Sequence, residues 1–262
     1  MHEVLVAFAL TLGAGLATSI GGVLGVFGKA GSTKTLSLGL GFSAGVMIYV
    51  SLFEILPKGR DALAGVHGEV PGNWLMVLGF FSGIAAIAII DHLVPSAVNP
   101  HEPGTIGDKH RKHALMRTGL MTAVALGIHN FPEGFATFMA GLQSPEIAIS
   151  VAVAIALHNI PEGLAVAVPV YQATGSRAKA LTWSSVSGLA EPAGALIGYL
   201  VLFPFMSDTL LGLVFAAIAG IMVFISLDEL LPSAEEYGEH HLAIYGVIAG
   251  MAVMAVSLVL LL

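Results

Sequence analysis

The chain has 262 residues, of which 56% are hydrophobic and only 10% are charged, whereas ordinary soluble domains carry about 25% charged residues. A soluble enzyme of this size would need far more polar surface, so that class is excluded. The 10 basic and 17 acidic residues give a formal net charge of −7, which argues against nucleic acid as a partner. Cysteine is absent, which excludes disulfides and thiolate metal sites.

Eight apolar stretches follow one another along the chain, each long enough to cross a bilayer as a helix. They cover residues 4–27, 35–57, 73–92, 114–140, 146–171, 180–203, 209–231 and 241–262. The first stretch lacks the basic start and the cleavage site of a signal peptide, so we interpret it as a retained span. The runs are continuous rather than alternating, which is typical of helices. We therefore predict an all-α membrane protein, a bundle of eight transmembrane helices forming a single domain, 1–262.

Basic residues are divided unevenly between the two sides of this predicted bundle. The side opposite to the termini holds eight of the ten: Lys29, Lys34, Lys109, Arg111, Lys112, Arg117, Arg177 and Lys179. The other side holds only Lys58 and Arg60. Because Lys and Arg are enriched in cytoplasmic loops, we expect both termini on the periplasmic or extracellular side of the cell's inner membrane.

The second and seventh spans share a sequence pattern. AGVMIYVSLFEILP (44–57) and AGIMVFISLDELLP (219–232) have eight identical residues at an offset of 175. The first span resembles the sixth, and the third resembles the eighth more weakly. For the weaker match, the shared Gly and Ala content of packed membrane helices remains an alternative explanation.

Similar spans that run in opposite directions indicate inverted-topology repeats, which are typical of transporters. We therefore predict a 3+2+3 inverted-repeat bundle. Its parts are a first three-helix repeat (1–92), a cytoplasmic loop (93–113), a central helix pair (114–171) and an inverted three-helix repeat (180–262).

The two central spans each carry one copy of a polar motif, HNFPEG (129–134) and HNIPEG (158–163). His and Glu four positions apart lie on one helical face, and the Asn beside each His adds an amide oxygen. Glu191 lies at a similar depth in the sixth span. The candidate ligands are therefore His129, Asn130, Glu133, His158, Asn159, Glu162 and Glu191.

These polar residues lie where the bilayer makes charge expensive, about 2.5–3.5 kcal/mol for each ionisable group. No Lys or Arg lies between Arg117 and Arg177, so the counter-charge must be protons or metal cations. Nitrogen and oxygen donors without thiolate suit zinc, iron(II), cobalt or manganese. We predict a metal site, with two adjacent ions bridged by Glu133 and Glu162.

Two of the candidate ligands have alternative interpretations. Glu191 precedes Pro192 and is either a ligand or a protonated acid at a kinked helix. Met47, in the second span, is either a ligand or a flexible packing residue. For a single motif taken alone, a hydrogen bond between helices is a further alternative.

With paired HNxPEG motifs on consecutive spans, the chain resembles the ZIP (Zrt/Irt-like) family of metal transporters over essentially its whole length, and among them the short bacterial zinc-uptake members. The resemblance implies import of divalent metal, zinc first and also iron, manganese, cobalt and cadmium, into the cytoplasm. It implies a two-metal midplane site, and movement of spans 1, 4, 5 and 6 against spans 2, 3, 7 and 8. The metal ion is then the substrate, no catalytic cofactor is expected, and the partners are metal ions and the bilayer. A homodimer is left open.

Two pairs of polar residues lie at the ends of the third and seventh spans, Asp91 with His92 and Asp228 with Glu229. The predicted orientation places both on the cytoplasmic side, where the resemblance implies an exit site. The alternative is that they are ordinary interfacial acids.

Two other functions use the same residues. A two-metal site can catalyse hydrolysis, which would make the protein an intramembrane metalloenzyme, although HExxH is absent. A proton or cation channel is the second alternative.

Overall fold

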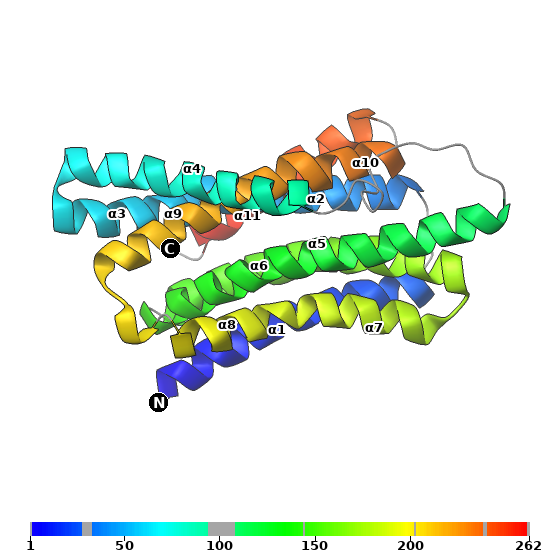
Figure 1. Cartoon of the computed structure of the whole chain (residues 1–262), viewed down its shortest axis with the longest axis horizontal. Helices are drawn as coiled ribbons and strands as arrows, with labels where there is room; N and C mark the ends of the chain where they lie inside the picture. The colour runs from blue at the N-terminus through cyan, green and yellow to red at the C-terminus, as the bar shows by residue number, and fades with distance from the viewer. Residues whose placement is uncertain are drawn as a thin grey trace.

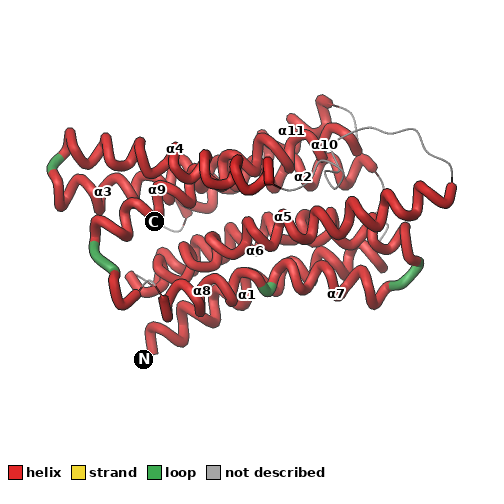
Figure 2. The backbone as a smooth tube through the Cα atoms, in the orientation of Figure 1, coloured by secondary structure: helices red, strands yellow, loops and turns green. Residues whose placement is uncertain are grey.

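The computed structural model describes residues 2–27, 33–93, 108–143, 145–201, 203–237 and 240–260. Within these segments the chain is helical nearly throughout and contains no strand. Figure 2 shows helices joined by short loops. The predicted all-α class is therefore confirmed.

The helices follow one another in this order: α1 (His2–Phe27), α2 (Thr33–Val50), the π-helical turn η1 (Ser51–Ile55), α3 (Leu56–His67), α4 (Glu69–Leu93), α5 (Asp108–Gln143), α6 (Pro145–Thr174), α7 (Arg177–Gly188), α8 (Ala190–Val201), the 3₁₀ turn η3 (Phe203–Phe205), α9 (Asp208–Ile225), the π-helical turn η4 (Ser226–Leu230), α10 (Leu231–Tyr237) and α11 (His240–Leu260).

Six helical segments in the described part of the chain are long and apolar enough to cross a membrane. They are α1, the continuous run α2–η1–α3, α4, α6, the run α9–η4–α10, and α11. The two remaining predicted spans correspond to α5 and to the pair α7 and α8. The protein is thus a multi-pass, all-α membrane protein, and the count of eight crossings stays a prediction.

Two helices extend beyond the boundaries that hydropathy predicted. The second span was expected to end at residue 57, but its helix continues through α3 to His67. Helix α5 begins at Asp108, so the end of the predicted loop 93–113 is helical. Hydropathy marks where the bilayer ends, whereas a polar helix continues past that point wherever its backbone hydrogen bonds continue.

The predicted sixth span, 180–203, is interrupted. Helix α7 ends at Gly188 and α8 begins after Leu189. Pro192 lacks an N–H group, and its ring collides with the carbonyl four residues earlier, which belongs to Gly188. The break therefore places Glu191 in the first turn of a new helix.

The helices form two layers (Figure 1). We call the group α2, α3, α4, α9, α10 and α11 the first layer, and the group α1, α5, α6, α7 and α8 the second layer. Helix α2 packs on α6, and α5 packs on α9, where the layers meet. The start of α1 and the end of α11 lie toward the same end of the bundle.

Within each layer, glycines bring helix backbones into direct contact. A Cβ at Gly163 would overlap the carbonyl oxygen of Thr18, which joins α6 to α1, and one at Gly41 would overlap that of Ala243, which joins α2 to α11. Between the layers, a Cβ at Gly39 would lie 3.6 Å from Cβ of Pro161, an ordinary van der Waals distance. Each layer is therefore more closely packed than this contact between the two.

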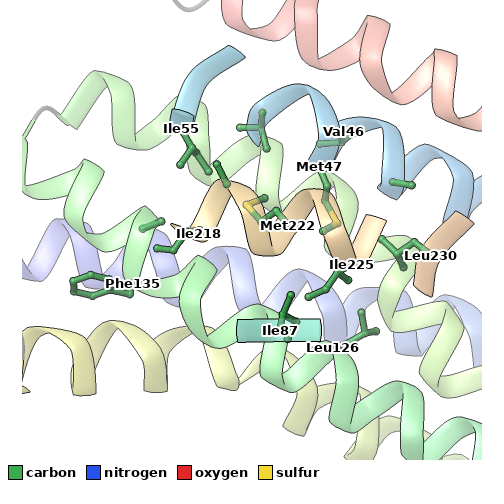
Figure 3. Packing of buried hydrophobic residues seen from close by; sticks show 14 of the residues in the cluster. Val46, Met47, Ile55, Ile87, Leu126, Phe135, Ile218, Met222, Ile225 and Leu230 are labelled. Atoms are coloured by element: carbon green, nitrogen blue, oxygen red, sulfur yellow. The ribbon is translucent and has the colours of Figure 1, made fainter. Parts of the chain in front are cut away.

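The layers meet in an apolar cluster that draws side chains from both (Figure 3). Leu126 of α5 lies against residues of the first layer, and the sulfur atoms of Met47 and Met222 lie in the same cluster. Met47 and Met222 are 0% and 1% exposed. The contact surface around the cluster is therefore largely apolar.

The two π-helical turns occupy equivalent positions in the repeated pattern. In η1 the Ser51 hydroxyl donates to the carbonyl oxygen of Met47 at 2.6 Å, and in η4 the Ser226 hydroxyl donates to that of Met222 at 2.7 Å. The paired sequences thus share a local conformation. The full 3+2+3 inverted-repeat arrangement remains a prediction.

A proline explains why the helix widens at these two places. Pro57 and Pro232 follow the turns directly, and a proline ring collides with the carbonyl four residues earlier. Those carbonyls belong to Phe53 and Asp228, inside η1 and η4. A π-helical turn relieves such strain and is frequent at functional sites.

Candidate metal centre

The predicted ligands on α5, α6 and α8 lie together in the interior of the second layer. Those whose side chains the structure describes are all 0% exposed: Asn130, Glu133, His158, Asn159, Glu162 and Glu191. No Lys or Arg is among the buried side chains of the described residues. The centre is therefore rich in donor atoms and contains no fixed cation.

The closest contact between the two HNxPEG motifs joins Glu133 of α5 to His158 of α6. Nε2 of the imidazole lies 3.0 Å from Oε1 of the carboxylate, and both side chains are fully buried. An imidazole nitrogen and a carboxylate oxygen facing each other are ligands that zinc accepts. The two motifs therefore face each other at this pair.

Asn159 connects the motif on α6 to two neighbouring helices. Its Nδ2 donates to the carbonyl oxygen of Ala14 on α1 at 2.9 Å and to Oε1 of Glu191 on α8. Glu191 also interacts electrostatically with Glu133 and with Glu162. The break before α8 thus directs a third carboxylate into the centre.

Glu162 lies where the second layer meets α2 of the first layer. Its Oε1 accepts a hydrogen bond from the Ser43 hydroxyl at 3.2 Å. The same hydroxyl lies 4.0 Å from the sulfur of Met47. Met47 is therefore close to these residues, and Ser43 is a neighbour of the predicted ligands that the sequence interpretation missed. Its spacing of four from Met47, on the same helical face, was the available indication.

Several oxygens of the centre accept no hydrogen bond within the described part of the chain. They are the amide oxygens of Asn130 and Asn159 and Oε2 of Glu191. The Asn130 amide nitrogen, by contrast, donates to the Ser187 carbonyl oxygen at 3.3 Å. Buried oxygens without donors are costly, and a metal ion is one ligand that would satisfy them.

The remaining predicted residues are described only in part. The side chains of His129 on α5 and Asp91 on α4 lie outside the described part of the structure. His92 and Asp228 are exposed and Glu229 is half-buried. Among the described residues, no three His, Asp or Glu side chains form a ready-made metal cluster.

The last residue of each motif is a glycine for a packing reason. A Cβ at Gly134 would overlap the carbonyl oxygen of Glu191, and one at Gly163 would overlap that of Thr18. The glycines let α5 reach α8, and α6 reach α1, at backbone contact. The ligands are thereby held at short range on packed helices.

Comparison with known proteins identifies the family of this chain. Residues 92–258 match the family described as ZIP zinc transporter. The chain belongs to this family. It is 64% identical over 260 residues to the zinc transporter ZupT of Corynebacterium glutamicum, which covers 98% of this chain and 99% of that one.

Other relatives match equally completely. The zinc transporter ZupT of Corynebacterium efficiens is 62% identical over 262 residues, covering 98% of both chains. That of Streptococcus mutans is 62% identical over 255 residues, covering 97% of both. The family is one of transporters, so the protein is not an enzyme, and the alternative of an intramembrane metalloenzyme is set aside.

Proposed function

We propose that the protein carries divalent metal ions, zinc first, through the buried centre on α5, α6 and α8. The observation that carries this proposal is the fully buried Glu133–His158 pair at 3.0 Å, with Glu162 and Glu191 close to it. A group of acids at this depth needs cations, and the described interior offers no Lys or Arg. The printed names of the relatives, all zinc transporters, support zinc.

In this proposal, His158, Glu133 and Glu162, together with His129, coordinate the ion. Asn130, Asn159 and Glu191 complete a two-metal site near the middle of the membrane, and Met47 lies alongside from α2. Iron(II), manganese, cobalt and cadmium ions are further substrates, because the same nitrogen and oxygen donors suit them.

We also propose that the second layer moves against the first during transport. The ligands belong to the second layer, apart from Met47. Glycine-mediated backbone contacts hold each layer together, whereas the contact surface between the layers is mainly apolar. A layer that moved as a unit would keep its ligand set intact.

The direction and the surroundings of the pathway follow from the predicted topology. The ion enters from the periplasmic or extracellular side, where both termini lie, and leaves toward the cytoplasm past Asp91, His92, Asp228 and Glu229. The membrane is the cell's inner membrane.

Zinc uptake into liposomes tests the proposal. Purified protein is reconstituted around an enclosed fluorescent zinc indicator, and the parent is compared with Glu133→Ala and His158→Ala. We expect saturable uptake by the parent and a loss of about tenfold or more in both variants, because each removes a ligand. Competition by iron, manganese, cobalt and cadmium then ranks the substrates.

A matched control exists on the surface. His240 and Glu235 form an exposed pair at 2.6 Å, so His240→Ala and Glu235→Ala remove the same chemistry outside the centre and should leave uptake unchanged. Non-saturating flux would indicate a channel instead. Equal uptake by the parent and the buried-pair variants would contradict the assignment of the centre.

A further inference from the structure

One face of α2 lies along α6, where the two layers meet. Leu36 packs with Leu164 and Val168 of α6, and Gly39 lies on Pro161. The next position on this face, at the helical spacing of four, is Ser43. A fully buried hydroxyl therefore continues an otherwise apolar contact between the layers.

The Ser43 hydroxyl has two acceptors within reach and one proton to donate. Oε1 of Glu162 lies at 3.2 Å in the second layer, and the sulfur of Met47 lies at 4.0 Å on the same helix. A carboxyl oxygen is a much stronger acceptor than a thioether sulfur. The proton is thus directed across the layers, to a residue that the proposed function makes a metal ligand.

We propose that Ser43 is a positioning residue that holds the two layers in the arrangement seen here while Glu162 carries no ion, and lets them separate when an ion binds. The inference rests on the proposed function. A divalent cation bound to Oε1 of Glu162 draws electron density from that oxygen and leaves it a weaker acceptor for the Ser43 hydroxyl, so loading the site weakens the link between α2 and α6. Metal occupancy and layer movement are coupled through this bond.

Distances between spin labels on the two layers test this coupling. The chain has no cysteine, so Lys34→Cys on α2 and Gln172→Cys on α6, both exposed, can be labelled without background. In the doubly labelled protein without metal we expect one narrow distance distribution. Zinc should add or shift a population.

Substitutions at Ser43 then separate positioning from simple packing. Without metal, Ser43→Ala should already show the broadened or shifted distribution, whereas Ser43→Thr, which keeps the hydroxyl, should resemble the parent. Ser37→Ala is the matched control, because Ser37 is also a fully buried serine on α2 but its hydroxyl makes no hydrogen bond within the described residues. It should leave the distribution unchanged.

Uptake kinetics give a second readout. Because zinc binding no longer has to weaken this hydrogen bond, Ser43→Ala should lower the apparent KM for zinc several-fold, and Ser43→Thr should restore the parent value. If Ser43→Ala does not fold, Ser43→Cys, with similar volume and a weaker donor, replaces it in this assay.

The outcomes distinguish the two proposals. If the parent takes up zinc, and the Ser43→Ala protein matches it in label distances and KM, the positioning role of Ser43 is wrong while the transporter stands. If the parent neither transports zinc nor changes its label distances with zinc, the proposed function itself fails.

Discussion

At the scale of single residues, the centre is defined by polar atoms that the bilayer forces to find partners inside the protein. Asn159 illustrates this, since one amide group reaches both the Ala14 carbonyl oxygen and Glu191. The Glu133–His158 contact at 3.0 Å is a second example, because each buried polar group has the other as its partner. An ion would add to this network rather than build a site from loose side chains.

Acidity should slow uptake through such a site. Imidazole and carboxylate groups bind metal only when they are deprotonated, so protons compete with zinc for His158 and Glu133. We expect the initial rate of zinc uptake to fall as the pH is lowered from about 7 to about 5, the range in which histidine changes charge. The measurement uses liposomes with equal pH on both sides, so that no proton gradient drives transport. Faster uptake at the lower pH would contradict this account.

At the scale of helices, the two HNxPEG motifs have both a chemical and a structural role. His, Asn and Glu provide donor atoms, while the closing glycines permit the backbone contacts that position them. The π-helical turns η1 and η4 are a second local feature, and each is explained by the proline that follows it. The sequence pattern thus specifies local geometry as well as ligands.

Adding one methyl group at a motif glycine should disrupt this packing. Gly163→Ala places a Cβ against the Thr18 carbonyl oxygen, and overpacking of this kind costs about 1–3 kcal/mol. We expect a lower unfolding temperature and reduced zinc uptake.

Gly127→Ala is the control for that substitution. Gly127 lies on α5, also in the second layer, and a Cβ there would meet nothing within 4 Å. Alanine favours a helix by up to about 1 kcal/mol over glycine. Its stability should match or exceed that of the parent. Equal behaviour of the two variants would show that the close contact at Gly163 is unimportant.

At the scale of the whole molecule, two layers meet across an apolar surface and the ligands lie almost entirely in one of them. The layer that holds the ligands packs backbone against backbone. The contact between layers at Gly39 and Pro161 is an ordinary one, at 3.6 Å. This division suits movement of one unit past the other.

A covalent link between the layers should stop transport reversibly. Leu36→Cys with Leu164→Cys joins α2 to α6 across their shared cluster. We expect oxidation to abolish zinc uptake and reduction to restore it, because the second layer can no longer move.

A link inside one layer serves as the comparison. Ser19→Cys with Ser185→Cys joins α1 to α7, where the two hydroxyl oxygens lie 2.9 Å apart, close enough for a disulfide after small adjustments. Uptake should survive this cross-link. Full uptake with the layers cross-linked would show that they do not move against each other.

The sequence by itself determined the features that depend on local composition and spacing. Long apolar runs specify membrane helices, and the interval of four within HNxPEG places His and Glu on one helical face. The absence of Lys and Arg near the acids indicated a cation. Paired motifs of this kind were enough to indicate the family.

Only the tertiary structure decided which helices meet. Ser43 and Glu162 are 119 positions apart, and Asn159 and Glu191 lie on helices separated by α7. The break at Leu189 and the continuation of the second span to His67 were equally hidden from hydropathy. A side-chain partner on another helix depends on how close the two backbones come, and residue spacing along one helix carries no information about that distance.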